Sequence, residues 1–111
     1  MIEVVIRNYL MNTVTEPVYA VIPEKITAPR YYVIEKTSGG MENRIKSSTI
    51  VVQSYAESMA AAMTMNDAAI DALIDCDADE VASVRLNADY NFTDPNMQQF
   101  RYQAVFDITH Y

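Results

Sequence analysis

The sequence predicts an α+β fold: a mainly antiparallel sheet of about four to five strands, with a long helix packed on one face and a short N-terminal helix. Two stretches have the pattern of β-hairpins, at 31–55 and 85–108, and a helical pattern lies between them. A sheet with a helix on one face buries the apolar sides of both. The chain has 111 residues, of which 50% are hydrophobic, so it can bury one modest core, and we expect a single domain over residues 1–111.

The N-terminal part predicts a short helix followed by a short edge strand. In residues 1–10 the apolar side chains recur at steps of three and four, as on an amphipathic helix. The β-branched run Val4-Val5-Ile6 would also suit an edge strand, which is the alternative. Two prolines bracket residues 18–22, so this run can form only a short strand at a sheet edge. Residues 24–30 lack periodicity and are expected to form a connecting loop.

The main sheet is expected to begin with a hairpin whose strands cover residues 31–37 and 45–55. Residues 31–34 are apolar on both faces, which indicates a strand covered on both sides at that end. The start of the second strand, Lys46-Ser-Ser-Thr49, is polar enough to stand in solvent. We therefore expect the hairpin to protrude beyond the body of the domain.

The expected tip of this hairpin is the segment 38–44. Paired glycines, Gly39 and Gly40, favour a tight or bulged turn because glycine adopts positive φ without strain. A glycine pair is also found in phosphate-binding loops, but no helix follows this one as such a loop requires. The structural role is the better interpretation.

A helix over residues 58–75 is the most strongly predicted element. Ser58 has the residue type of an N-cap, and one face is mostly apolar. This face comprises Met59, Ala62, Met63, Asn66, Ile70, Leu73 and Ile74. The opposite face carries an acidic stripe, Asp67, Asp71 and Asp75, in which like charges recur at i,i+4 without cations. Such a stripe is tolerated on a free surface, and it would also suit a neighbouring subunit that presents basic residues.

The last third of the chain predicts a second hairpin around the turn sequence Asp94-Pro95-Asn96. Apolar and polar residues alternate along both of its strands, so each strand is expected to offer one apolar face. The expected apolar sets are Leu86, Ala88, Tyr90 and Phe92 on the first strand and Phe100, Tyr102, Ala104, Phe106 and Ile108 on the second. Tyrosines and methionines such as Met59, Met63, Tyr90 and Tyr102 are interpreted as core residues rather than as a ligand site.

Composition and charge argue against several functional classes. The net charge of −7 and the scattered positions of the eight Lys and Arg residues disfavour binding to nucleic acid. An acidic wall can let DNA slide past without holding it, although solubility alone explains most acidic surfaces. The sequence has no apolar run of the length needed for a membrane span, so no membrane association is expected. The lone Cys76 excludes an internal disulfide and fits a reducing compartment.

No catalytic or cofactor motif is present, so we expect no enzyme activity, no cofactor and no metal. Cys76 lies among acidic residues, which should raise its pKa and make it a poor nucleophile. His110, next to the last residue, is interpreted as solvated or packed rather than catalytic. The acidic run 75–79 matches the start of a calcium loop, but Glu80 replaces the required glycine and Leu86 the required glutamate.

The order of these segments resembles a known family. The segments are Val18-Tyr-Ala-Val-Ile-Pro23, then Tyr31-Tyr-Val-Ile-Glu-Lys-Thr-Ser-Gly-Gly40, then Thr49-Ile-Val-Val-Gln-Ser-Tyr-Ala-Glu-Ser58 leading into a helix, and finally Phe100-Arg-Tyr-Gln-Ala-Val-Phe-Asp-Ile108. From about Pro17 to Ile108 the chain is similar to the tail-terminator or tail-completion (tail-to-head joining) proteins of long-tailed bacteriophages. The resemblance implies a structural virion protein, usually a hexameric ring, that ends tail-tube polymerisation and joins the tail to the head.

The resemblance also implies partners and a location. These are other copies of the chain, the tail tube protein and the head connector, at the head–tail interface of a virion or prophage particle assembled in the cytoplasm of a bacterial host. DNA would pass through the ring without specific binding. The expected subunit interface is Ser38, Gly39, Gly40, Met41, Glu42, Asn43, Arg44 and Lys46, for which the alternative is an ordinary mobile loop. The alternative functions are another head–tail connector or neck protein and a small ferredoxin-like binding module.

Overall fold

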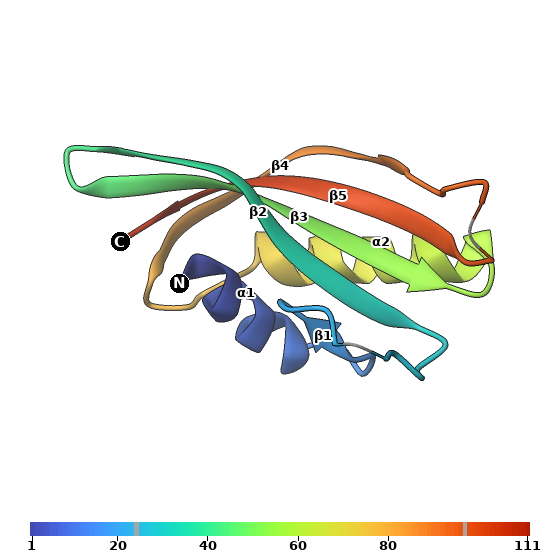
Figure 1. Ribbon diagram of the computed structural model, residues 1–111. Coiled ribbons are helices and arrows are strands. Elements are labelled where there is room, and N and C mark those ends of the chain that lie inside the picture. Colours follow the sequence, from blue (N-terminus) through green and yellow to red (C-terminus); the bar gives the residue numbers. More distant parts are fainter. Residues whose placement is uncertain (24, 97) are drawn as a thin grey trace.

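The computed structural model describes residues 1–23, 25–96 and 98–111 as two helices and five strands (Figure 1). The elements are α1 (Ile2–Met11), β1 (Val18–Tyr19), β2 (Tyr31–Glu42), β3 (Ile45–Ala56), α2 (Met59–Ile74), β4 (Val81–Asn91) and β5 (Phe100–His110). The strands form one sheet in the order β1-β2-β3-β5-β4, in which only the β1–β2 pair is parallel. The predicted α+β fold, with a mainly antiparallel sheet and two helices, is confirmed.

Both helices lie against the same face of the sheet, and the main core fills the space between the helices and that face (Figure 1). On the sheet side this core contains Tyr32, Ile50 and Phe106, all fully buried. On the helix side it contains Ile6 of α1 and Leu73 of α2. The buried hydroxyl of Tyr32 donates to the carbonyl oxygen of Met65, at 2.9 Å, so this large side chain leaves no unpaired polar atom in the core.

The N-terminal segment is a helix, as the periodicity predicts, and the edge-strand alternative is wrong. Ile2, Ile6 and Leu10 are buried at the i, i+4 spacing of one helix face, whereas Val4 is exposed. The strand predicted at 18–22 is present at the sheet edge but is only two residues long, Val18–Tyr19. It pairs with Tyr32 and Val33 of β2.

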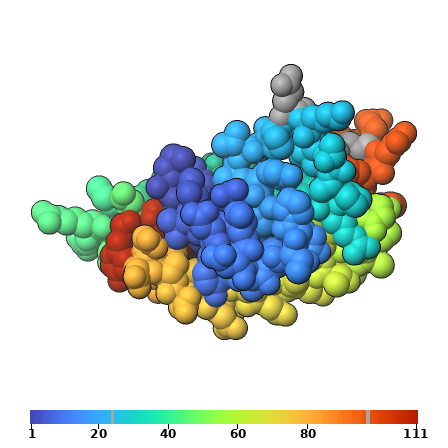
Figure 2. Space-filling view, turned by 90° about the horizontal axis from the view of Figure 1, so that it is seen from below, coloured from blue at the N-terminus to red at the C-terminus, as the bar shows by residue number. Residues whose placement is uncertain are grey.

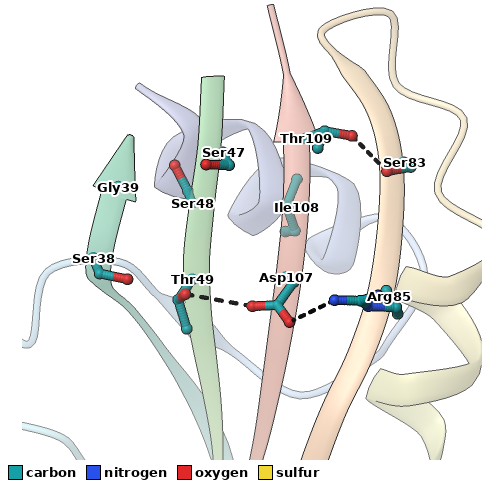
Figure 3. A pocket seen from close by; sticks show the side chains of 10 residues that line it. All are labelled: Ser38, Gly39, Ser47, Ser48, Thr49, Ser83, Arg85, Asp107, Ile108 and Thr109. Atoms are coloured by element: carbon teal, nitrogen blue, oxygen red, sulfur yellow. Dashed lines mark hydrogen bonds and ion pairs between the residues drawn. The ribbon is translucent and has the colours of Figure 1, made fainter. Parts of the chain in front are cut away.

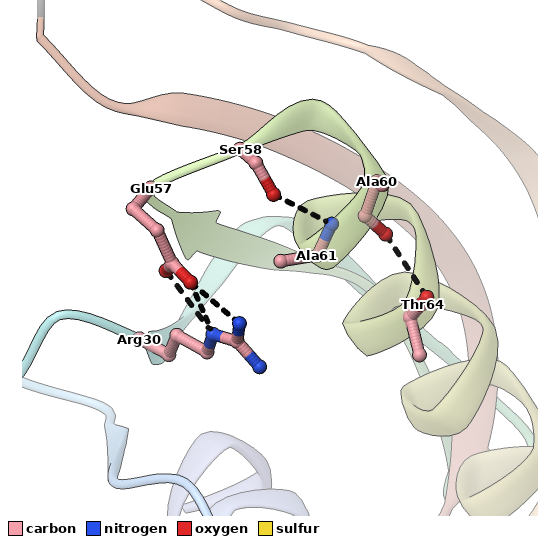
Figure 4. A network of polar contacts seen from close by, with 6 residues as sticks. All are labelled: Arg30, Glu57, Ser58, Ala60, Ala61 and Thr64. Atoms are coloured by element: carbon pink, nitrogen blue, oxygen red, sulfur yellow. Dashed lines mark hydrogen bonds and ion pairs between the residues drawn. The ribbon is translucent and has the colours of Figure 1, made fainter.

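Helix α2 begins where the sequence predicts it. The Ser58 side chain accepts a hydrogen bond from the backbone N–H of Ala61, at 3.1 Å, and the bidentate Arg30–Glu57 pair lies beside this cap (Figure 4). The buried face differs in part from the predicted one. Ala62, Met65, Asn66, Ala69, Ala72 and Leu73 are buried, whereas Met63 and Ile74 are about half exposed. Three small alanines form much of this buried face, which lets the helix lie close to the sheet.

The predicted apolar face of β4 is wrong in its second half, because a register shift between Leu86 and Ala88 reverses the alternation. Leu86 pairs with Phe106 and packs on the helix-side core. Beyond the shift, Asp89 pairs with Ala104 and accepts a hydrogen bond from Asn66 of α2, at 3.0 Å. Tyr90 therefore lies on the opposite face of the sheet, where it is 40% exposed.

The face of the sheet away from the helices carries a smaller cluster. Tyr31 and Tyr55 stack with ring centroids 4.7 Å apart, and together with Val33 they are buried. The guanidinium of Arg101 lies over the Tyr55 ring at 5.7 Å and over the Phe92 ring at 4.5 Å. The prediction that residues 31–34 are covered on both faces is confirmed, since all four are buried.

Candidate assembly surface

The β2–β3 hairpin projects from one end of the molecule (Figures 1 and 2). Strand β5 ends at His110, opposite Lys46 of β3, so the hairpin continues beyond the last residue of its neighbour. The molecule is correspondingly elongated, with principal extents of 45 × 26 × 23 Å. We call residues 36–46 the arm; all of them are exposed, including every residue of the predicted interface.

The turn at the tip of the arm is formed by Asn43 and Arg44, not by the glycine pair. Asn43 has φ of 52° and Arg44 has φ of 67°, and no described glycine has positive φ. Two successive left-handed residues are typical of the hairpin turn whose twist matches that of the strands, and asparagine tolerates this conformation well. Gly39 and Gly40 lie inside β2, paired with Ser48 and Ser47. The expectation that they supply positive φ is therefore wrong.

Gly39 has a different role, which concerns Lys36. A Cβ atom at Gly39 would lie 2.8 Å from Cε and 3.1 Å from Nζ of Lys36. The lysine side chain thus lies along the strand over the bare glycine backbone, pointing toward the tip of the arm. The absence of a side chain at Gly39 makes room for this cation.

A register shift between Lys36 and Ser38 puts the lysines and the glutamates of the β2–β3 hairpin on opposite faces. Lys36 pairs with Ile50, and Ile50 belongs to the helix-side core, so Lys36 and Lys46 lie on the helix side of the sheet. Glu35 pairs with Val51, and Glu42, beyond the shift, pairs with Ile45, so both glutamates lie on the other side. Without the extra residue, Glu42 would share the face of Lys36. Lys36 and Lys46 thus share one face of the arm, and Arg44, the third cation of this segment, lies in the turn at its tip.

A hydroxyl-rich hollow of about 660 Å³ lies at the base of the arm (Figure 3). Its wall includes Ser38, Ser47, Thr49, Ser83 and Thr109, and its charged groups are Arg85 and Asp107. The pKa of Asp107 is lowered, first by the hydrogen bond that it accepts from Asn87 and then by Arg85. No group of three metal-ligating side chains occurs in the part of the chain that the structure describes.

His110 is packed, which is one of the two roles that the sequence predicts for it. Its Nε2 lies 2.8 Å from the Ser48 hydroxyl, and only 6% of His110 and 4% of Ser48 is exposed. Burial lowers the pKa of His110, and Lys46 and Lys36 act in the same direction. A histidine beside a serine can form a nucleophile–base pair. Here both side chains are almost fully buried on the helix side of the sheet, and we interpret the pair as structural.

The acidic stripe is exposed, as predicted, on the outer face of α2 at Asp67, Asp71 and Asp75. The turn that follows α2 adds Asp77, Asp79 and Glu80, also exposed. Cys76 lies within this turn, partly buried; its pKa is raised mainly by burial, with Asp77 and Glu80 adding to the effect. The acidic sequence around Cys76 predicts a raised pKa, and this direction is correct, although burial is the larger cause.

No ion pair joins the arm to the acidic residues within the described part of one chain. In the described residues the ion pairs are Arg30–Glu57 and Arg85–Asp107, and neither involves the arm or the turn after α2. Both sets of charges therefore face solvent. No helix in the described part of the chain is long and apolar enough to cross a membrane.

Comparison with known proteins gives a match of fold. No family model matches the sequence, and no curated protein does. A solved structure titled "Virion of native gene transfer agent (GTA) particle" contains a chain that matches with a TM-score of 0.67. The match covers 96% of this chain and 84% of that chain, at 15% sequence identity. The chain shares its fold with a protein of a gene transfer agent virion. At this identity the likeness concerns the fold alone.

Proposed function

We propose that this chain is a structural, non-enzymatic protein of a phage-like particle, and that it forms a ring at the head-proximal end of the tail. In this role it would end tail-tube polymerisation and join the tail to the head connector. The observation that carries the proposal is the fold shared with a virion chain over 96% of the length, together with the projecting arm. The resemblance of the sequence to tail-completion proteins supports the specific position, and six copies is the ring size that it implies.

The edges of the sheet support association between copies. Strand β1 pairs only with Tyr32 and Val33, so in the described structure the outer edge of β2 has no strand partner from Ile34 to Glu42. Strand β4 forms the other edge of the sheet. Unpaired strand edges are templates for another chain. Because the two edges differ, a contact between them is head-to-tail, and contacts of that kind form rings when the rotation from copy to copy closes.

The charge of the chain suits a ring through which DNA passes. A net charge of −7 repels the phosphate backbone, so a channel lined by acidic side chains would not hold the DNA. The resemblance to tail-completion proteins implies the tail tube protein and the head connector as partners, and assembly in the cytoplasm of the bacterial host. Another head–tail connector or neck position is the closest alternative.

The alternative of a small binding module depends on the hollow at the base of the arm. Its hydroxyl groups and the Arg85–Asp107 pair could bind a small polar ligand. A ligand-binding role would make Asp107 essential and the length of the arm unimportant. A ring-forming role would make the length of the arm essential and Asp107 unimportant.

Deletion of the gene in cells that produce the particle tests the proposal. We expect separate heads and tails, with tails of irregular or excessive length, and restoration of joined particles by the intact gene. Complementation with a gene that carries Asp107→Asn distinguishes a ring subunit from a ligand-binding module. A ring subunit with this substitution should still restore joined particles, whereas a ligand-binding module should not. Joined particles of normal tail length in the deletion strain would contradict the proposal.

A further inference from the structure

Two oppositely charged segments of this chain have no charged partner within the described structure. The arm carries Lys36, Arg44 and Lys46, three of the eight cations of the chain, and among residues 36–46 its one carboxylate is Glu42, which lies on the other face. The turn at 75–80 carries four carboxylates in six residues and no cation. We call this segment the acidic turn.

The topology places the arm and the acidic turn at the same end of the molecule but toward opposite edges of the sheet. The paired residues Met41, Lys46, His110 and Val81 form a row across β2, β3, β5 and β4. The acidic turn precedes Val81 directly, and the backbone N–H of Tyr111 donates to the carbonyl oxygen of Glu80. Val81, which follows the turn, is therefore level with the Met41–Lys46 pair in the outer part of the arm. The turn lies at the β4 edge of the sheet, whereas the arm has its free edge on the β2 side (Figures 1 and 2).

This placement makes the two segments complementary between copies in one arrangement. When copies stand side by side in the same orientation, the β4 side of one faces the β2 side of the next. The acidic turn of the first copy then lies level with the arm of the second. Two chains that each carry a net charge of −7 repel each other overall, so a contact that joins the cationic arm to the acidic turn is favoured over contacts between acidic surfaces.

We propose that the basic face of the arm of one copy binds the acidic turn of the next copy, and that this contact repeats around the ring. The inference rests on the proposed function and names the contact that closes the assembly. Lys36 and Lys46 would face Asp77 and Asp79, and the missing side chain at Gly39 leaves room for Lys36 to lie along the arm. Since these groups are exposed in a single chain, the contact should weaken as salt concentration rises.

Charge reversal tests the contact in complementation of the deletion strain. One variant carries Lys36→Glu and Lys46→Glu, a second carries Asp77→Lys and Asp79→Lys, and a third carries all four substitutions. We expect the first two to lower the yield of joined particles by about tenfold or more and the third to recover most of it. A matched control, Asp67→Lys with Asp71→Lys on α2, should complement normally.

The outcomes distinguish failure of the proposed contact from failure of the proposed function. Full complementation by the first variant, or failure of the third to recover, would overturn the contact while the proposed function stands. Normal particles in the uncomplemented deletion strain would instead overturn the proposed function, and with it the contact.

Cys76, the only cysteine of the chain, provides a second test because it lies inside the acidic turn. In a Met41→Cys variant, a short bis-maleimide linker applied to purified particles should join the arm of one copy to Cys76 of the next. We expect a ladder of covalent products that ends at the ring size, and its loss when Cys76→Ser is added. Absence of the ladder from joined particles would exclude the contact, and a ladder that ends at dimers would exclude the ring.

Discussion

Shortening the arm by two cross-strand pairs should abolish assembly and leave the fold intact. The variant lacks Met41, Glu42, Ile45 and Lys46, so the Asn43–Arg44 turn closes directly on the Gly40–Ser47 pair. The turn residues that tolerate positive φ are kept, and removing two residues per strand preserves which face each side chain occupies. The arm becomes shorter by about 7 Å, since a strand rises about 3.3 Å per residue.

The expected cost to stability is small because the deleted side chains bury little surface. Met41 is 68% exposed and Ile45 is 46% exposed, so together they lose roughly 1–2 kcal/mol of apolar burial. The lost ladder hydrogen bonds cost about as much again. The shortened chain no longer loses the conformational entropy of ordering these four residues, and this saving is comparable to the loss or larger. We expect the free energy of unfolding to change by less than about 1.5 kcal/mol. Phe106→Ala, at a fully buried position, should cost about 3–5 kcal/mol and serves as the destabilised control.

Urea unfolding followed by circular dichroism gives the stability of both variants, and complementation of the deletion strain gives their assembly. The shortened variant should unfold near the parent midpoint yet yield unjoined heads and tails. A loss of stability as large as that of Phe106→Ala would show that the arm belongs to the folding core. Normal particles from the shortened variant would refute the assembly role of the arm.

Three further predictions concern stability in solution, each measured by urea or thermal unfolding of the purified protein. Ser58→Ala removes the N-cap bond of α2 and should cost about 1 kcal/mol, whereas Ser58→Asp should cost much less; equal losses would argue against capping. Arg44→Gly relieves a positive φ and should stabilise the hairpin by about 0.5–1 kcal/mol, and destabilisation would contradict the turn geometry. Burial lowers the pKa of His110 in the fold, so the unfolded chain binds its proton first and stability should fall as pH drops below about 6.5; His110→Gln should flatten that part of the pH profile. An unchanged profile in that variant would assign the pH dependence to other groups.

The sequence predicts the elements of this fold better than the faces that they present. The 58–75 helix follows from an N-cap residue and a long periodic stretch, and the burial of Ala104, Phe106 and Ile108 follows from simple alternation. The periodicity predicts that Met63 is buried, whereas Met63 is half exposed in the structure. Because alanines fill the middle of the helix face, small differences in packing decide which larger side chains turn inward, and periodicity cannot resolve them.

A register shift accounts for the wrong face predicted in β4, because the shift after Leu86 moves Tyr90 to the face away from the helices. The shift after Lys36 separates Glu42 from the lysines of the arm, and the sequence predicts nothing about that separation. No residue type marks either position in the sequence. The turn was misplaced for a related reason: glycine is the stronger turn signal, yet an exposed strand accommodates Gly39 and Gly40 and the twist of the hairpin favours Asn43–Arg44.

The arm itself could be predicted from its polar stem, whereas its charged face could not, because that face depends on the register shift. Its role as a subunit interface stays a prediction. Electron microscopy of purified particles that carry a labelled copy of this protein locates the proposed ring. We expect the label only in a ring at the junction of tail and head, and at the free end of tails that lack heads. A label along the length of the tube, on the head shell, or absent from the particles would contradict the proposal.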